Sequence, residues 1–256
     1  YITGIGCGNC AKTSPVIMKE WTEEYPELVL FEYEIYRHRQ ENARVQKNYF
    51  AIYLPERRRG GIPFLAFSQD YAPVGRTQVL KAEQKIKDMS SNPFPDRYGR
   101  AIPFSELDVT KLPGYFIIWT KNRVLIPGPG GNNELLKRII TAPDLSAVMS
   151  GVPFTEIEPV SLDIPGGKVF FEHAAEVGGW RLQWNGEGVE ALKGGEQARW
   201  LTWLLGGLIL LMIFLALSTG TRKAKKGEVR KFQWKSRIKD IVVVVLSLGV
   251  LAGFFL

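Results

Sequence analysis

The spacing of apolar positions in the first ninety residues indicates a chain that alternates between strands and helices. Period-two runs of aliphatic and aromatic residues indicate strands, whereas apolar positions three and four apart indicate amphipathic helices. The predicted elements are a short strand before Cys7, a helix over 8–24, a strand over 28–36, a strand over 64–67 and a helix over 77–89. This part of the chain is therefore expected to carry a strand–helix–strand unit, followed by a strand and a closing helix.

The pattern changes after residue 90. Residues 90–112 are rich in Pro, Ser and charged residues and indicate a connecting loop. The next predicted elements are strands over 115–120 and 123–126 joined by a turn at Lys121–Asn122, a helix over 133–140, and short strands within 152–185. We expect residues 113–199 to form a small β-rich elaboration of the first domain, 1–112, or a small second α+β domain.

Two long apolar runs close the chain. Residues 200–218, WLTWLLGGLILLMIFLALS, contain no charge, and at about 1.5 Å per residue they extend about 28 Å, close to the ~30 Å core of a bilayer. The second run, 241–256, is shorter and reaches the chain end, so we expect a thin or truncated span. These runs predict two C-terminal transmembrane helices. Because the chain begins at Tyr1 rather than Met, we also expect an upstream signal peptide or anchor to be missing.

The formal net charge of +7 comes from the segment between the two apolar runs. Of the 33 basic and 26 acidic residues, nine and two respectively lie between 221 and 240, so the remainder carries 24 of each. Short loops rich in Lys and Arg stay in the cytoplasm. This makes 219–240 a cytoplasmic loop and places 1–199 on the extracytoplasmic side of a plasma or inner membrane. The charge is a signal of topology, and no nucleic-acid partner is expected.

The two cysteines, Cys7 and Cys10, lie at the start of the predicted 8–24 helix. Two cysteines cannot form a disulfide scaffold for a chain of this length, but an oxidising extracytoplasmic side favours their pairing. At a helix N-terminus the unpaired N–H groups and the helix dipole favour a thiolate, which attacks disulfides. A thiol one helical turn later can resolve the mixed disulfide. We therefore predict Cys7 as the nucleophile and Cys10 as the resolving thiol.

The residues around the cysteine pair resemble the active-site helix of thioredoxin-like proteins. The match comprises GCGNC over 6–10 and Pro15 five residues later. The resemblance covers about residues 1–90 and implies a thioredoxin-like α/β fold, with a central mixed sheet flanked by helices. It also implies that Gly8, Asn9 and Pro15 tune the reactivity of the pair. Asn9 cannot become a cation, so it favours a thiolate less than the His that some members carry.

A second stretch, GGIP over 60–63, resembles the cis-proline loop of the same family. The resemblance implies that Gly61, Ile62 and Pro63 face the cysteine pair and bind the substrate backbone. More narrowly, the run around the pair resembles membrane-tethered thioredoxin-like domains, some of which precede CcdA/DsbD-type electron-carrying membrane helices. Neither apolar run contains a cysteine, so the sequence shows no transmembrane dithiol relay.

Other interpretations exist for the same residues. A zinc site needs four ligands, and the histidines, His38 and His173, lack ligand-like spacing to the cysteine pair, so no metal is expected. The disulfide can be purely structural, Pro63 can be an edge-strand proline, and Pro15 can mark the end of the helix. His38, within residues 37–41, is expected in a solvated turn.

Together these observations predict a membrane-anchored, extracytoplasmic thiol–disulfide oxidoreductase. Its redox group is the Cys7–Cys10 disulfide itself, so no metal or organic cofactor is expected. The expected partners are protein disulfides or dithiols and a membrane redox partner that recycles the pair. One alternative is a relay module that passes electrons from a CcdA/DsbD-type membrane reductase to extracytoplasmic acceptors. Another is a non-enzymatic scaffold or adhesion domain with an inert disulfide.

Overall fold

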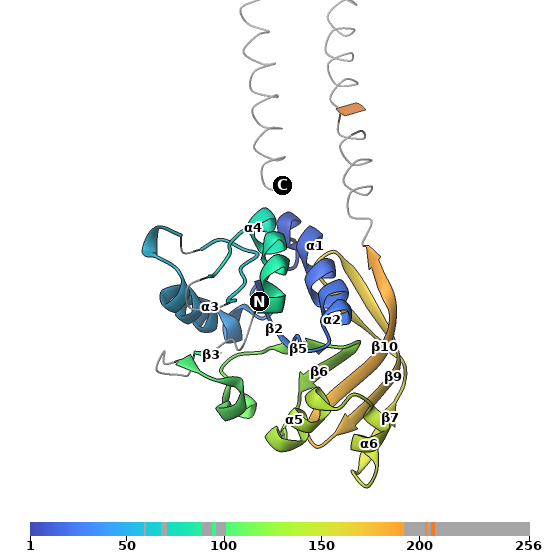
Figure 1. Ribbon diagram of the computed structural model, residues 1–256. Helices are drawn as coiled ribbons and strands as arrows, with labels where there is room; N and C mark the ends of the chain where they lie inside the picture. The colour runs from blue at the N-terminus through green and yellow to red at the C-terminus, as the bar shows by residue number, and fades with distance from the viewer. Residues whose placement is uncertain are drawn as a thin grey trace, which may run out of the picture. The chain divides into compact units, whose positions relative to one another are not determined.

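Tyr1 to Leu192 form one compact unit of mixed α/β structure, built on a curled mixed sheet (Figure 1). The computed structural model describes residues 1–58, 60–67, 71–88, 94–95, 101–191, 203 and 206–207. The predicted α/β class is confirmed at this level.

The main sheet has eight strands in the order β1–β2–β5–β6–β10–β9–β7, and β8 also pairs with β9. Its strands are β1 (Ile2–Thr3), β2 (Leu30–Glu34), β5 (Ile117–Thr120), β6 (Arg123–Pro127), β7 (Phe154–Ile157), β8 (Val160–Ile164), β9 (Gly167–Val177) and β10 (Trp180–Ala191). β1 and β2 are parallel, and the other neighbours are antiparallel. Phe64 adds single antiparallel bridges to Ile2 and to Val74. A separate pair is formed by β3 (Phe94–Pro95) and β4 (Ala101–Ile102).

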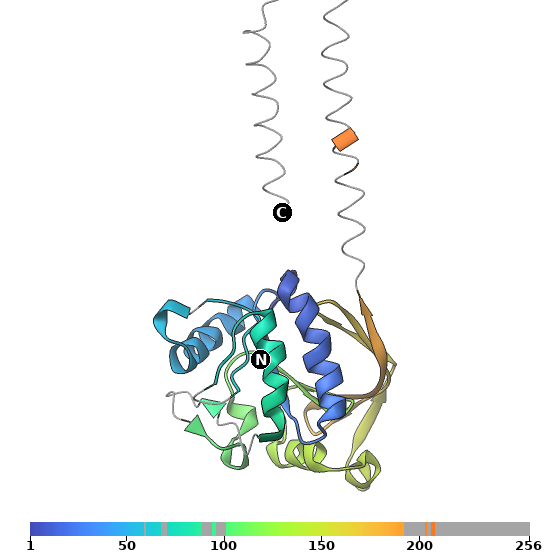
Figure 2. The same ribbon diagram turned by 45° about the horizontal axis from the view of Figure 1, so that its top comes forward.

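The helices lie on both faces of the sheet. They are α1 (Gly8–Pro15), a π-helical turn (Val16–Glu20), α2 (Trp21–Glu24), α3 (Arg39–Tyr53), α4 (Arg76–Lys81), α5 (Asn133–Thr141) and α6 (Leu145–Met149). Short 3₁₀ turns cover Glu56–Arg58, Ala82–Asp88, Phe104–Glu106 and Val109–Lys111. Figure 2 shows α4, in teal, alongside the blue α1–α2 helix, and the two are in contact.

Two hydrophobic clusters hold the layers together, because alternate residues of a strand point to opposite faces. On one face, Leu30 packs with Trp21 of α2 and Val79 of α4. On the other face, Phe31 packs in a cluster that includes side chains of α3 and α5. The alternation along β2 therefore fixes which helices cover which face, and it places α1 and α2 on the same face as Leu30.

Several predicted elements are confirmed. The helix over 8–24 is continuous, although its middle is π-helical. The hairpin of β5 and β6 turns at Lys121 and Asn122, which both have the positive φ angles of a tight hairpin turn. β5 pairs directly with β2, so this hairpin belongs to the same sheet as the first ninety residues.

One expectation around the loops is wrong, and a second holds only in part. The strand predicted over 64–67 is reduced to isolated bridges at Phe64. Residues 65–67 are not part of a strand. His38 does lie in a turn and is half-buried, but this turn is shorter than the predicted 37–41, since α3 begins at Arg39. That helix buries Val45 and Tyr49 against the sheet, and tertiary packing compensates for its polar first half.

The predicted membrane segments are not covered by this description. Residues 200–218, 219–240 and 241–256 lie outside the described residues, apart from Trp203, Gly206 and Gly207. Among the described residues, no helix combines the length and the apolar character that crossing a membrane requires.

Candidate functional site

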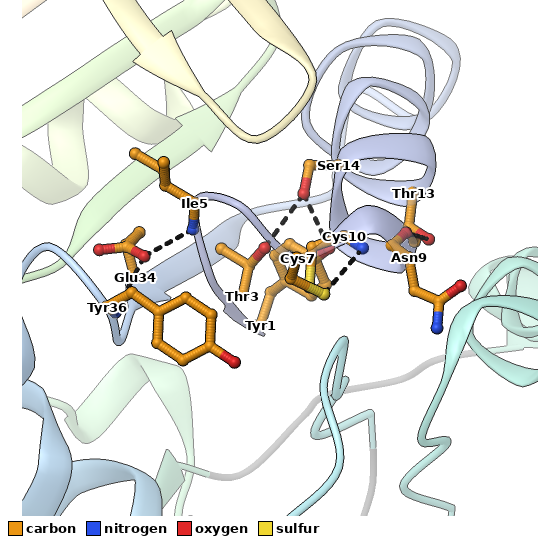
Figure 3. The surroundings of a disulfide bond; sticks show 10 residues. All are labelled: Tyr1, Thr3, Ile5, Cys7, Asn9, Cys10, Thr13, Ser14, Glu34 and Tyr36. Atoms are coloured by element: carbon orange, nitrogen blue, oxygen red, sulfur yellow. Dashed lines mark hydrogen bonds between the residues drawn. A yellow bond between two sulfur atoms is a disulfide. The ribbon is translucent and has the colours of Figure 1, made fainter. Parts of the chain in front are cut away.

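Cys7 and Cys10 form a disulfide at the N-terminus of α1 (Figure 3). Their Cα atoms are 5.2 Å apart. Cys7 is the N-cap residue, and its Sγ accepts a hydrogen bond of 3.2 Å from the backbone N–H of Cys10. The predicted pairing is confirmed. The sulfur of Cys7 faces the first turn of the helix, where unpaired N–H groups stabilise negative charge.

The two cysteines differ in exposure. Cys10 is completely buried, whereas Cys7 is partly exposed and is followed by the exposed residues Gly8 and Asn9. A second molecule can therefore approach the sulfur of Cys7, while Cys10 is accessible only from within the protein.

Pro15 lies inside a longer helix. In a regular helix the N–H of residue 15 would donate to the carbonyl of Ala11, but proline has no N–H group. The chain continues as the π-helical turn, in which the N–H of Trp21 donates to the carbonyl of Val16. Residues 16–24 remain helical, so the alternative that Pro15 ends the helix is wrong.

Gly61, Ile62 and Pro63 lie beside the segment that leads to Cys7. Ile2 and Phe64 exchange two backbone hydrogen bonds, of 2.8 and 3.0 Å. The peptide bond between Ile62 and Pro63 is cis. The side chain of Ile62 lies against Gly4, where an added Cβ atom would be 2.9 Å from its Cδ1. The loop is thus brought to the strand that precedes the disulfide, and on its other side the carbonyl of Pro63 accepts the N–H of Gly75 at 2.8 Å.

Three buried hydroxyl groups lie near the disulfide (Figure 3). Ser14 Oγ is 2.9 Å from Tyr1 Oη and 3.2 Å from Thr3 Oγ1. Ser14 follows Cys10 by four residues, so both lie on the same face of the helix. Burial raises the pKa of the Tyr1 hydroxyl above its ordinary value of 10. The three hydroxyls thus form a buried polar cluster beside the helix that carries the disulfide, and in the sequence only the spacing of Ser14 from Cys10 indicated it.

Glu34 connects the segment before Cys7 to the turn that begins α3. Its carboxylate accepts four backbone N–H groups: those of Ile5 at 2.8 Å, Tyr36 at 2.9 Å, Arg37 at 2.5 Å and His38 at 3.2 Å. The side chain is buried at the end of β2, so these bonds are shielded from water. No local pattern in the sequence indicates this role, because the partners lie both before α1 and after β2.

Tyr36 provides an exposed aromatic ring on the same side of the site. The residue is 54% exposed, and a Cβ atom added to Gly4 would lie 2.7 Å from two of its ring carbons. The ring and Ile62 therefore both pack over Gly4, which leaves an apolar surface beside the approach to Cys7.

Glu32 is a second buried acid of β2, two residues before Glu34. It is 3% exposed, and its carboxylate accepts a hydrogen bond of 2.8 Å from the indole N–H of Trp119. Burial raises the pKa of Glu32 from 4.5 to about 7; the bond from Trp119 lowers it, and the charge of Glu34 raises it further. This carboxyl therefore changes its charge near neutral pH.

The histidines take part in ring stacking. His38 stacks on Tyr115 with ring centroids 3.9 Å apart, and His173 stacks on Trp184 at 5.6 Å. Within the part of the chain that the structure describes, no three His, Cys, Asp or Glu side chains are grouped as metal ligands.

Comparisons with known proteins do not assign the chain to a family. No protein-family model, no curated protein and no solved structure matches it. Inference about function therefore rests on the geometry of the disulfide and on the motif residues around it.

Proposed function

We propose that the chain is a membrane-anchored thiol–disulfide oxidoreductase whose thioredoxin-like part lies outside the cytoplasm. The observation that carries this proposal is the Cys7–Cys10 disulfide at the N-terminus of α1, with Cys7 partly exposed and Cys10 buried. A four-residue loop gains only about 2 kcal/mol from closure, against ~3 kcal/mol for a loop of about fifteen residues. The pair is a weak structural crosslink, and its position favours reaction with a second molecule.

The arrangement around β1 supports the thioredoxin-like assignment of residues 1–112. The helix that carries the cysteines connects the parallel strands β1 and β2. After the GGIP stretch, Phe64 bridges to β1 in the antiparallel sense, and α4 then packs beside α1. The membrane anchor is supported by the uncharged run 200–218, the run 241–256 and the basic residues between them.

The order in which the two cysteines react follows from their exposure, because Cys7 is partly exposed and Cys10 is buried. In the reducing direction, the Cys7 thiolate attacks a substrate disulfide: a Cys7–substrate S–S bond forms, the substrate S–S bond breaks, and a thiolate leaves and takes up a proton. Cys10 then loses its proton and attacks the Sγ of Cys7. The Cys7–Cys10 bond forms, and the second substrate thiol is released. Two electrons have passed to the substrate, and a membrane redox partner must return them; oxidation of substrates reverses the steps.

Trapping of the mixed disulfide tests this proposal. In the full chain, Cys10→Ser removes the resolving thiol and is expected to accumulate a covalent adduct with protein substrates, seen on non-reducing gels after acid quenching. Cys7→Ser removes the nucleophile and should give no adduct. The wild type, which keeps both cysteines, is the control. Absence of adducts with both cysteine variants would support the inert disulfide, and adducts with Cys7→Ser alone would reverse the two roles.

A further inference from the structure

The hairpin of β8 and β9 packs against the helix that carries the cysteine pair. Figure 3 shows this hairpin, in yellow, beside the first turns of α1, and α1 and β8 are in contact. Gly166, in the hairpin turn, lies directly against α1, and its φ is +98°. A Cβ atom there would lie 3.0 Å from the carbonyl carbon of Ala11, closer still to its oxygen, and 3.2 Å from Pro15 Cγ. Both the φ angle and the available space therefore require glycine.

Gly166 touches the carbonyl of Ala11, the residue that follows Cys10. The N–H of Ala11 donates to the carbonyl of Cys7 at 2.9 Å, which closes the first turn of α1. The carbonyl of Ala11 lacks its regular helical donor because residue 15 is proline. Gly166 fits against this carbonyl because it carries no side chain. A side chain at position 166 that displaced Ala11 would therefore also displace the first turn of α1, which carries both cysteines.

The hairpin is itself firmly anchored. Ile164 is 2% exposed and belongs to the cluster that also contains Ile17 of the cysteine-bearing helix. Asp163 forms ion pairs of 3.5 Å with Arg37 and with Lys168. These pairs are half exposed and contribute little stability, so the burial of Ile164 is the main anchor.

We propose that the β8–β9 turn is a positioning element for the cysteine pair and that Gly166 is its key residue. This inference rests on the proposed oxidoreductase function. Holding the first turn of α1 keeps the two thiols close together, which raises their effective concentration and favours the disulfide. By linkage, forming the disulfide must in turn stabilise the packing of the hairpin on α1.

Redox equilibria of two glycine variants test the inference in the full chain. Gly166→Ala places a methyl group against Ala11, whereas Gly130→Ala also puts alanine at a positive φ angle, +71°, but with no described atom within 4 Å of the new Cβ. Against glutathione, Gly166→Ala should shift the equilibrium about tenfold toward the dithiol, which is a rise of about 30 mV. Gly130→Ala should match the wild type. A Gly166→Ala value within about twofold of the control, or a shift toward the disulfide, would overturn the inference.

The wild-type result separates the two proposals. If the wild type exchanges with glutathione and the two variants behave alike, only the positioning role fails. If the wild type does not exchange, the proposed function fails and the inference fails with it.

A second measurement covers the case in which Gly166→Ala does not fold. Hydrogen exchange of the wild-type protein compares the amides of residues 166–168 in the oxidised and the reduced state. They should exchange faster after reduction, while the amides of Ser150 and Val152, which donate to Ser146 and Met149 at the end of α6, should not change. Equal rates at 166–168 in both states would refute the coupling.

Discussion

Replacing Glu32 by Gln removes a buried charge with little change in side-chain shape. Glu32 is 3% exposed and accepts the indole N–H of Trp119, a bond that the amide oxygen of glutamine can also accept. The substitution therefore tests what the ionised carboxylate costs the fold.

The expected difference in the free energy of unfolding between Glu32→Gln and the wild type follows from the pKa of Glu32. Burial raises the pKa of Glu32 from 4.5 to about 7, which corresponds to about 3 kcal/mol. Below the pKa that Glu32 has in the unfolded chain, the carboxyl is neutral in both the folded and the unfolded state and does not destabilise the fold. As the pH rises toward the folded value, the unfolded chain loses its proton first, so the free energy of unfolding falls. Above about pH 7 the loss is complete, and Glu32→Gln should be more stable than the wild type by about 3 kcal/mol.

Urea unfolding of the oxidised full chain in detergent, followed by near-ultraviolet circular dichroism, gives the required free energies. The difference between Glu32→Gln and wild type should grow by about 3 kcal/mol between about pH 4.5 and about pH 8. Glu156→Gln on the exposed strand β7 removes the same charge from the surface and should show no such growth. A difference that stays constant over this range would refute the reasoning.

Two further substitutions test other parts of the account. Tyr36→Ala removes the exposed ring beside the approach to Cys7, and kcat/KM for a protein disulfide should fall about tenfold while the rate with a small disulfide is unchanged; equal losses with both substrates would contradict a docking role. Arg123→Met removes the buried guanidinium that donates to the carbonyls of Ile139, Ala142 and Pro143 at 2.7, 2.7 and 3.1 Å. Urea unfolding should show a loss of about 3 kcal/mol, and a loss below ~1 kcal/mol would show that these carbonyls find other donors.

Local patterns predicted the elements whose determinants are close in sequence. The helix over 8–24 carries its apolar positions on one face, and the β5–β6 hairpin has a turn residue, Asn122, that tolerates positive φ. The cysteine spacing likewise predicted the pairing of Cys7 and Cys10, because three positions along a helix place the two sulfurs within reach of each other.

Elements that depend on distant partners could not be predicted in this way. The first half of α3 is polar, and the helix is stabilised by burial of Tyr49 and Phe50 against the sheet. Glu34 looks like a surface residue in sequence, yet its carboxylate accepts hydrogen bonds from backbone N–H groups that come together only after folding. The close approach of Gly166 to Ala11 joins segments about 150 residues apart, and no sequence motif predicts it.

The central claim is that Cys7 and Cys10 exchange electrons reversibly with thiols. Equilibration of the full chain with glutathione measures the reduction potential of the pair directly. We expect rapid exchange and a potential between about −270 mV, typical of a thioredoxin-like reductant, and about −120 mV, typical of a strong oxidant. A value near the first limit would indicate a reductive pathway, and one near the second would indicate donation of disulfides. Slow exchange with a potential below about −300 mV would contradict the claim and identify a structural disulfide.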